Sequence, residues 1–294
     1  MDGGERLSAV VVTYNALPWL ERCLESLRGH ETIVVDHGSE DGTLELVGRR
    51  FPEAVVLRRE NRGYGAGLNA GLAAASGRYV LLLNSDAWAE PGALERLVAF
   101  ADEHLRAGLV GPRARNPDGS PQVTVRAFPT LWRLATEYYF IRKLAPRSRA
   151  LNAFYAGGRD LDRPQPVDWV MGFAMLVRRE AVDAVGGFDE SFFMFSEETD
   201  LCRRLWDAGW EVWYAPEAEF THVAGASHGG RLFDENVRGH LRFLAKHRGD
   251  AYAARARLLL LWALRLRALL FPGERGRMYR RAARMLASGY GGGA

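Results

Sequence analysis

The sequence predicts an α/β protein in which helices flank a mostly parallel central sheet and a helical extension follows. Short runs rich in Val and Leu alternate with helix-like segments over the first third of the chain, which is typical of a parallel sheet covered by helices. The segments that connect successive runs are short, as a compact α/β layer requires. The composition of the 294 residues agrees, because 48% are hydrophobic and 26% are charged, the balance of a globular protein with a substantial core.

Each element of this alternation has a local signal. The predicted strands are the apolar runs at residues 7–14, 32–36, 54–57, 79–84 and 109–111. The predicted helices between them cover residues 18–28, 43–50, 65–75 and 91–104. Two of these helices begin with proline and one follows an Asp-Gly turn, which are ordinary signals of a helix start. Residues 112–125 predict a hairpin or an excursion, and residues 142–166, which mix Arg, Pro and Gly without a period, predict a mobile loop.

The second half of the chain is predicted with fewer signals. Residues 168–178 predict a strand and residues 186–189 a turn. Residues 196–208 predict a helix with Ser196 as its N-cap and acids in its first turn. The remaining predicted elements are short strands at residues 211–215 and 218–223 and basic helices from residue 231 onward. We therefore divide the chain into a body, residues 1–230, and a C-terminal extension, residues 231–294.

Charge is distributed unevenly between these two parts. The formal net charge is +3, but residues 1–230 carry 25 Lys and Arg against 32 Asp and Glu, whereas residues 231–294 carry 14 against 4. An acidic body argues against a nucleic-acid partner, and the basic extension suits an anionic surface such as phospholipid headgroups. The run from Leu258 to Phe271 is too short to span a bilayer, and its arginines point to all sides of a helix. The extension is expected to contact either an anionic membrane surface or a protein surface, such as a second copy in a homodimer.

Cysteine usage and the N-terminal residues indicate the compartment. Cys23 and Cys202 form no CxxC pair, which excludes a disulfide framework and favours a reducing environment. The first six residues are acidic and glycine-rich, unlike a signal peptide. We expect a cytoplasmic protein that the basic extension can hold peripherally on the inner face of the cell membrane.

Polar residues follow four of the predicted strands. They are Thr13-Tyr14-Asn15, the segment 36–43, Asn61-Arg62-Gly63 and Asn84-Ser85-Asp86. Any one of them could be an ordinary turn, but ligands bind at the carboxyl ends of the strands in open α/β sheets, and four such clusters predict a ligand site at one edge. The glycines of residues 61–67 do not fit GxGxxG, and no GxxxxGK motif occurs, so a Rossmann dehydrogenase and a P-loop ATPase are poor interpretations.

Acidic residues supply candidates for a metal site and a general base. Asp86 follows a buried strand, where a carboxylate is costly unless a cation such as Mg²⁺ or Mn²⁺ compensates it; a turn or helix-cap role is the alternative. Glu197, Glu198 and Asp200 begin a predicted helix, where capping alone explains one or two acids. A carboxylate near helix amides is expected to stay ionised at neutral pH, as a general base must. His222 suits Mn²⁺, although a lone histidine is more often structural.

Four segments, in this order and spacing, resemble a known family. They are VVTYN, VVDHGSEDGT, ENRGYGAGLNAGLAAASGRYVLLLNSDA and DWVMGFAMLVRREAVDAVGGFDESFFMFSEETDLCRRLWDAGWEVWYAPEAEFTH. Together they span about residues 7–225 and resemble the inverting family 2 glycosyltransferases of GT-A fold, particularly the bacterial rhamnosyltransferase-like branch. The resemblance implies that residues 1–112 form a nucleotide-sugar-binding half and residues 113–230 an acceptor and catalytic half.

The resemblance also assigns residues to the donor and the acceptor. The implied nucleotide-sugar-binding residues are Thr13, Tyr14, Asn15, Asp36, Asn61, Arg62, Ser85 and Asp86. Asp36 would contact a pyrimidine base, and Asn61 and Arg62 would lie near the ribose and the diphosphate. The wall where sugar and acceptor meet would be formed by Asp168, Trp169, Gly187, Phe188 and Asp189.

The metal and catalytic residues follow from the same comparison. Asp86 corresponds to the last acid of a metal-binding DxD motif whose first acid is here Asn84, and His222 matches a histidine that completes coordination of Mg²⁺ or Mn²⁺. Glu198 falls on the catalytic aspartate of the family, with Glu197 before it. Because Glu is one methylene longer than Asp, the choice between these two glutamates stays open.

The resemblance implies metal-dependent, inverting transfer of a sugar from a nucleoside diphosphate to a hydroxyl of a glycan or lipid-linked acceptor in cell-surface polysaccharide synthesis. Thymidine-diphosphate rhamnose is the favoured donor. One alternative is a catalytically idle GT-A-like module that binds nucleotide sugar or membrane, which the retained Asp86 and Glu198 argue against. Another is a nucleotidyltransferase, but residues 13–18 do not supply the glycine-rich phosphate loop that it needs.

Overall fold

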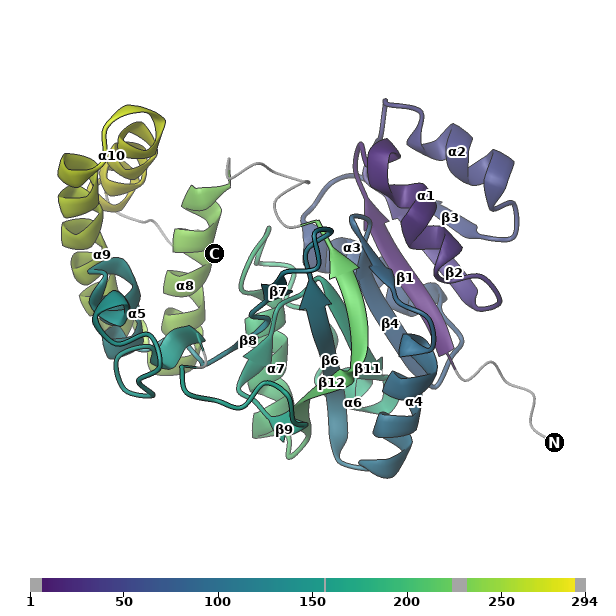
Figure 1. Cartoon of the computed structure of the whole chain (residues 1–294). Helices are drawn as coiled ribbons and strands as arrows, with labels where there is room; N and C mark the ends of the chain where they lie inside the picture. The colour runs from purple at the N-terminus through teal and green to yellow at the C-terminus, as the bar shows by residue number, and fades with distance from the viewer. Residues whose placement is uncertain (1–6, 156, 224–231, 289–294) are drawn as a thin grey trace. The chain divides into compact units, whose positions relative to one another are not determined.

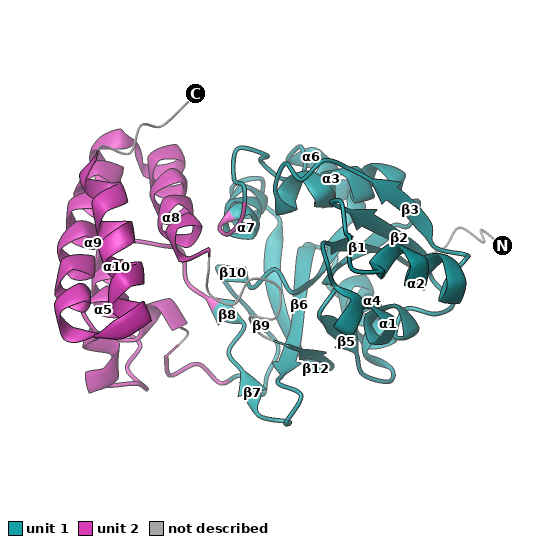
Figure 2. Ribbon diagram, turned by 90° about the horizontal axis from the view of Figure 1, so that it is seen from above, with its two compact units in different colours: residues 1–125, 161–193, 197–227 teal, residues 126–160, 194–196, 228–294 magenta. Residues whose placement is uncertain are grey.

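The computed structural model describes residues 7–155, 157–223 and 232–288 (Figure 1). The expectations for the first six residues fall outside these ranges. The chain forms two compact units. Unit 1 comprises residues 1–125, 161–193 and 197–227, and unit 2 comprises residues 126–160, 194–196 and 228–294 (Figure 2). Unit 2 thus combines the C-terminal extension with a segment that the sequence placed in the acceptor half.

Unit 1 contains a mixed sheet with the strand order β3-β2-β1-β4-β11-β6-β12-β5. Its strands are β1 (Leu7–Thr13), β2 (Glu31–Asp36), β3 (Val55–Arg58), β4 (Tyr79–Asn84), β5 (Ala87–Ala89), β6 (Ala107–Arg115), β11 (Ala174–Arg178) and β12 (Glu211–His222), with β7 (Pro121–Gln122) paired to β6 and β9 (Gln165–Pro166) paired to β12. The strands β8 (Val125–Arg126) and β10 (Trp169–Val170) form a separate two-stranded sheet. Strands β1 to β4 are parallel, whereas β11 is antiparallel to both β4 and β6. The predicted α/β class with a mostly parallel sheet is confirmed.

Helices cover both faces of this sheet because side chains alternate along its strands. The helices are α1 (Leu17–Glu25), α2 (Thr43–Arg50), α3 (Tyr64–Ala74), α4 (Ala93–Glu103), α6 (Arg179–Ala184) and α7 (Glu197–Asp207). Val11 of β1 belongs to a core cluster that includes Leu20 of α1 and Leu97 of α4. Val10, which points to the other face, meets α3 so closely that a Cβ on Gly71 would lie 2.2 Å from its Cγ1. The small residues of α3 therefore allow the helix to approach the sheet closely.

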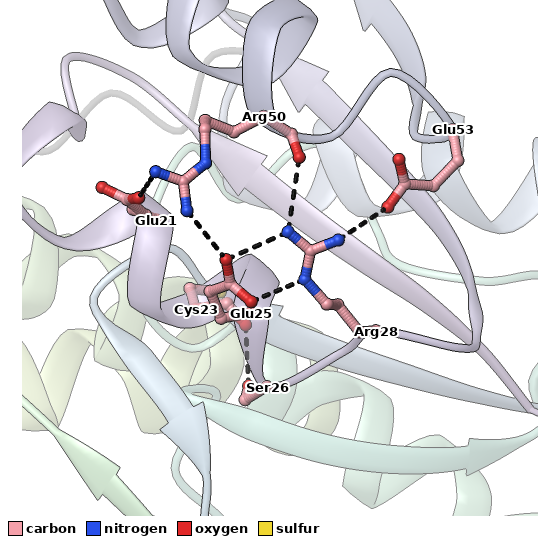
Figure 3. A network of polar contacts seen from close by, with 7 residues as sticks. All are labelled: Glu21, Cys23, Glu25, Ser26, Arg28, Arg50 and Glu53. Atoms are coloured by element: carbon pink, nitrogen blue, oxygen red, sulfur yellow. Dashed lines mark hydrogen bonds and ion pairs between the residues drawn. The ribbon is translucent and has the colours of Figure 1, made fainter.

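An exposed network of ion pairs joins α1 to α2 and the turn after it (Figure 3). Arg28 binds Glu25 at 2.6 Å and approaches Glu53 at 3.7 Å. Arg50 binds Glu21 at 2.8 Å and Glu25 at 3.3 Å. Solvent screens these exposed charges, so the network contributes little to the stability of the fold.

Several predicted elements coincide with the structure and others require correction. The helix at residues 43–50, the strand at residues 79–84 and the hairpin, seen as the antiparallel pair β6 and β7, are confirmed. The single strand at residues 168–178 is wrong, because residues 171–173 separate β10 from β11. The two strands at residues 211–223 are one strand, β12, whose register shifts between Ala215 and Glu219.

Unit 2 is helical. Its elements are α5 (Leu131–Tyr138), α8 (Phe233–Arg248), α9 (Asp250–Leu270), α10 (Gly273–Ala287) and the 3₁₀ turns η1 (Ile141–Leu144) and η2 (Ala153–Tyr155). Helix α9 packs against α5, α8 and α10. Among the residues described, no helix is both long enough and apolar enough to cross a membrane.

Candidate active site

The carboxyl ends of β1, β2 and β4 lie at one edge of the sheet (Figure 1). Thr13 pairs with Asp36 across β1 and β2, and Val12 pairs with Asn84 across β1 and β4. The polar clusters that follow these parallel strands therefore share one edge, as the sequence predicts.

Asn15 joins the loop after β1 to the loop after β2. Its backbone nitrogen donates to the Ser39 hydroxyl at 2.9 Å, and its side-chain oxygen accepts from the Glu40 nitrogen at 2.9 Å. The φ angle of Asn15 is 50°, in the left-handed region that asparagine tolerates better than most residues. The neighbouring Tyr14 is 57% exposed, so its ring is accessible to a planar ligand.

Asp36 is buried at the end of β2 and shapes the following loop. Its carboxylate accepts hydrogen bonds from the backbone nitrogens of Gly38 at 3.0 Å and Ser39 at 3.1 Å. His37 donates its backbone nitrogen to the Thr13 carbonyl at 3.0 Å, which holds this loop beside β1. The contact of Asp36 with a pyrimidine base stays a prediction.

Asp86 and His222 form a buried pair at the same edge. Strand β5 runs antiparallel to β12 with Ala87 opposite His222, and the Val223 nitrogen donates to the Asp86 carbonyl at 2.9 Å. The Nε2 of His222 lies 3.7 Å from the Oδ1 of Asp86. The neighbouring Ser85 is buried as well. Two residues separated by more than 130 positions are thus adjacent because one strand pairing places them so.

Gln122 determines which nitrogen of His222 faces Asp86. The Nε2 of Gln122 donates to the Asn116 side-chain oxygen and to the His222 carbonyl, both at 2.7 Å. Its Oε1 must then accept, at 2.9 Å, from the Nδ1 of His222. Burial lowers the pKa of His222, partly opposed by the charge of Asp86. The neutral imidazole therefore presents the lone pair of its Nε2 to the carboxylate.

This donor set fits a divalent cation. One carboxylate oxygen and one imidazole nitrogen are ligands that Mn²⁺ accepts, and a hydrogen-bonded second nitrogen is typical of a ligating histidine. No group of three or more His, Cys, Asp or Glu side chains suited to a metal occurs within the described ranges. Asp86 and His222 could hold Mg²⁺ or Mn²⁺ only with further oxygens from phosphates and water, which is how these ions are commonly bound.

Tyr64, the first residue of α3, lies near both the candidate metal ligand and the candidate catalytic glutamates. Its hydroxyl donates to the Asn84 side-chain oxygen at 2.6 Å and lies 3.4 Å from the Gly172 carbonyl. Burial raises the pKa of the Tyr64 phenol well above its usual value, and the charges of nearby acids raise it further. These acids are Glu197, Asp86 and Glu198, in decreasing order of effect. The candidate metal ligand and both candidate bases therefore surround one phenol.

At the start of α7, the side chains of Glu197 and Glu198 are both directed into the protein interior. The preceding residues Phe195 and Ser196 have φ angles of 67° and 70°, so Ser196 is left-handed and not extended as expected of an N-cap. Such strain in residues other than glycine is found at functional sites. Glu197 and Glu198 are both buried, and a Cβ on Gly172 would lie 3.6 Å from the Cγ of Glu198.

The two glutamates differ in their surroundings. The Oε2 of Glu197 has no hydrogen-bond partner among the described residues. Burial raises the pKa of Glu197 well above its ordinary value, and the charge of Glu198 raises it further. Burial and the neighbouring charge therefore favour the protonated form of Glu197. This raised pKa opposes the expectation, for Glu197, that the acids of this cluster stay ionised.

Asn69 positions part of the predicted wall. Its side chain accepts from the Phe188 nitrogen at 2.8 Å and donates to the Phe188 carbonyl at 2.9 Å. The preceding Gly187 has a φ of 72°, and a Cβ there would lie 2.7 Å from the Asn69 oxygen. Phe188 is buried and meets Gly65 of α3, whose Cβ position lies 3.2 Å from it. The wall residues 187–189 are thus fixed against α3 beside Glu197.

The remaining predicted site residues lie around this centre. Arg62 is exposed and lies 3.4 Å from the Glu190 carboxylate, next to the wall, while the Asn61 side chain accepts from the Gly63 nitrogen at 3.2 Å. Asp168 is half-buried, and the buried Trp169 begins β10, which packs against α7. Asp189 accepts from the Ser191 nitrogen at 2.9 Å.

Sequence reasoning did not single out three residues that organise the site, Tyr64, Asn69 and Gln122. Tyr64 and Asn69 lie inside one of the segments that carry the family resemblance. Gln122 carries no local signal, because its partner His222 lies 100 residues away.

The fold is that of the GT-A glycosyltransferases. The chain matches the structure of TarS from S. aureus in complex with UDP with a TM-score of 0.54, 17% identity, and coverage of 94% of this chain and 78% of that one. It matches the mannosyltransferase PcManGT from Pyrobaculum calidifontis, in complex with GDP-Man and Mn²⁺, with a TM-score of 0.56, 18% identity, and coverage of 96% and 84%.

Sequence similarity assigns the family. The profile described as glycosyl transferase family 2 matches residues 8–186, and the chain belongs to this family. It is 34% identical to the N-acetylglucosaminyl-diphospho-decaprenol L-rhamnosyltransferase of Mycobacterium tuberculosis, over 96% of this chain and 98% of that protein. It is 25% identical to the rhamnosyltransferase WbbL of Escherichia coli over 81% and 92%. The chain is an inverting glycosyltransferase, as the resemblance implies.

Proposed function

We propose that this glycosyltransferase moves rhamnose from thymidine-diphosphate rhamnose to a hydroxyl of a lipid-linked, diphosphate-bearing sugar in cell-surface polysaccharide synthesis. The observation that carries the proposal is the similarity to the mycobacterial rhamnosyltransferase, which extends over nearly the full length of both chains. The name of that relative states a decaprenol-linked acceptor and a rhamnosyl group.

The donor would bind at the carboxyl edge of β1, β2 and β4. The exposed Tyr14 ring offers a stacking surface for the base, and the loop held by Asp36 lies beside it. The exposed Arg62 guanidinium can approach the diphosphate, because its present partner, Glu190, is an exposed group whose attraction solvent screens.

Asp86 and His222 would hold Mg²⁺ or Mn²⁺ at this edge. Their adjacent oxygen and nitrogen atoms, 3.7 Å apart, are the structural support. Structures of similar fold contain Mn²⁺ together with UDP or GDP-Man. When bound, such an ion supplies positive charge that neutralises the departing diphosphate.

Glu198 is the proposed general base. It would accept the proton of the acceptor hydroxyl as that oxygen attacks the anomeric carbon opposite the leaving diphosphate, so the configuration inverts. The raised pKa of Glu197 favours its protonated form, whose O–H would donate a hydrogen bond in the site. This division of roles favours Glu198 over Glu197, which the sequence left open.

Release of nucleoside diphosphate tests the proposal. Wild type is expected to release thymidine diphosphate from thymidine-diphosphate rhamnose when Mn²⁺ and a lipid-linked N-acetylglucosaminyl diphosphate are present. Thermal unfolding with a panel of nucleotide sugars checks the donor, since the bound donor stabilises the fold by mass action. A chain that is stabilised by the donor but releases no diphosphate with any acceptor would be an idle binding module, and the proposal would fail.

A further inference from the structure

Helix α9 presents a continuous apolar stripe to solvent. The stripe consists of Leu258, Trp262, Leu266, Leu269 and Leu270, which are 39–86% exposed. The first four are spaced by four, four and three residues, the spacing of one helical face. The opposite face of α9 carries buried residues such as Leu260 and Leu264 and packs within unit 2 (Figure 2).

Two arginines of α9 direct their guanidinium groups toward the rest of unit 2. Arg267 is buried and donates to the backbone carbonyls of Tyr138 at 2.8 Å and Glu137 at 2.7 Å. Arg257 is half-buried and donates to the Leu286 carbonyl at 2.7 Å. The arginines do project from several sides of the helix, as the sequence predicts, but these two side chains serve the packing of unit 2 and leave the stripe apolar.

The arginines that remain exposed on α9 lie beside the stripe. Arg255 is one turn before Leu258, and Arg265 places its guanidinium 4.9 Å from the centre of the Trp262 ring. Trp and Arg side chains with an apolar body and a polar end are suited to the boundary between lipid headgroups and acyl chains.

The charge of unit 2 indicates which kind of surface the α9 stripe would bind. Unit 2 carries 21 Lys and Arg against 6 Asp and Glu, whereas unit 1 carries 18 against 30. A basic unit that exposes leucines and a tryptophan is complementary to an anionic bilayer, which offers both negative headgroups and an apolar interior. A second copy of the same basic unit would instead bring like charges together.

We propose that the α9 stripe inserts into the headgroup region of an anionic membrane, with α9 lying in the plane of the surface. The attachment is peripheral and reversible, because one helix face buries few side chains. It does not depend on the proposed donor or reaction, so it can be measured without substrate.

The test is sedimentation of the full chain with lipid vesicles. Wild type is expected to bind vesicles of phosphatidylcholine that contain phosphatidylglycerol, and to bind pure phosphatidylcholine and high-salt samples more weakly. The variant Leu258→Ser/Trp262→Ser/Leu266→Ser is expected to lose about tenfold or more in binding. Leu105→Ser, which changes a 70% exposed leucine in unit 1, is the matched control and is expected to bind like wild type.

Two further measurements make each outcome decisive. Circular dichroism shows whether the triple variant folds; if it does not, Leu269→Ser alone, at an 86% exposed position, replaces it and is expected to lose about threefold. Light scattering without vesicles shows the oligomeric state. The proposal is overturned if wild type does not bind anionic vesicles or if the stripe variants bind like wild type. It is also overturned if wild type is a dimer that the stripe substitutions dissociate, since the stripe would then be a subunit interface.

Discussion

Gln122 accepts a hydrogen bond from the Nδ1 of His222 at 2.9 Å and so leaves the Nε2 of that ring facing Asp86. This relationship predicts that Gln122 supports metal binding without touching the metal. Gln122→Leu removes the group that accepts from Nδ1 of His222. The imidazole ring can then rotate and adopt either tautomer, so Mn²⁺ affinity is expected to fall about 10-fold to 100-fold. Titration of Mn²⁺ by electron paramagnetic resonance measures the change.

Gln165→Leu is the control, because Gln165 lies in β9, another two-residue strand of the same sheet. It is expected to bind Mn²⁺ like wild type. Asp86→Asn and His222→Ala should each weaken binding more strongly than Gln122→Leu. If these two variants bind Mn²⁺ like wild type, the cation lies elsewhere.

The second prediction separates the roles of the two glutamates. Glu198→Gln removes the proposed base and is expected to lower kcat by about 10² to 10⁴ while donor binding persists. Glu197→Gln keeps a hydrogen-bond donor at a position that is already uncharged, so kcat is expected to stay within about tenfold of wild type. Diphosphate release measures kcat, and thermal unfolding with donor measures binding. The opposite ranking of the variants would assign the base to Glu197.

The third prediction follows from the raised pKa of Glu197. Between its ordinary value of 4.5 and its raised value in the fold, the unfolded chain has lost this proton while the folded chain keeps it. The unfolded state then binds fewer protons, so stability is present below pH 4.5 and falls as the pH rises through the raised pKa. Glu197→Gln removes the carboxyl group and with it this loss of stability at high pH. Its free energy of unfolding in urea is expected to exceed that of wild type by more at pH 8 than at pH 5.

The exposed Glu217 provides the control for this experiment. Glu217→Gln is expected to change the free energy of unfolding by a similar small amount at both pH values. If the difference between Glu197→Gln and wild type is likewise independent of pH, the carboxyl of Glu197 is ionised in the folded protein.

The fourth prediction concerns His240 in α8, which is buried against Phe154 with ring centres 5.8 Å apart. Burial lowers the pKa of His240 from 6.5 to about 4. As the pH falls below 6.5, the unfolded chain takes up this proton before the folded chain does, so stability is lost. At pH 5 the loss is about 2 kcal/mol. His240→Leu should abolish this part of the difference in unfolding free energy between pH 7 and pH 5, whereas His30→Leu, in unit 1, should retain it.

The parallel half of the sheet could be predicted because β1 and β4 are continuous apolar runs with polar residues directly after them. The insertion of β11 between β4 and β6 could not, since alternation within residues 168–178 says nothing about the partner of a strand. The break at residues 171–173 also lacks a local signal, because it depends on tertiary contacts such as the hydrogen bond from Met171 to the Thr124 carbonyl.

The same distinction applies to the site. Asp86 and Glu198 could be proposed from the sequence, because Asp86 closely follows an apolar strand, Glu198 lies in the first turn of a helix, and both lie in segments that resemble the family. The raised pKa of Glu197 could not, since it arises from burial and from the neighbouring charge of Glu198. The exposed charge on α9 could not be predicted for a similar reason, because a helical projection cannot show that Arg267 donates to two carbonyls of α5.

The fifth prediction ties the packing of α3 to the site at its N-terminus. A Cβ on Gly71 would lie 2.2 Å from the Cγ1 of Val10, which is fully buried in β1. Neither the α3 backbone nor the Val10 side chain can easily move to relieve this clash. Gly71→Ala is expected to destabilise the protein by about 1–3 kcal/mol, as overpacked cores do. Gly48→Ala, inside α2 with nothing within 4 Å of the new Cβ, should instead stabilise it by about 0.5–1 kcal/mol.

Movement of α3 away from β1 should also displace Tyr64, whose hydroxyl donates to Asn84, close to the proposed metal ligand Asp86. Gly71→Ala is therefore expected to weaken Mn²⁺ binding, although Gly71 lies two helical turns from Tyr64, while Gly48→Ala leaves it unchanged. Adding Val10→Ala to Gly71→Ala makes room for the new methyl group and should restore part of both losses, which a double-mutant cycle measures. Equal Mn²⁺ binding by Gly71→Ala and wild type would mean that the close approach of α3 to the sheet serves stability alone.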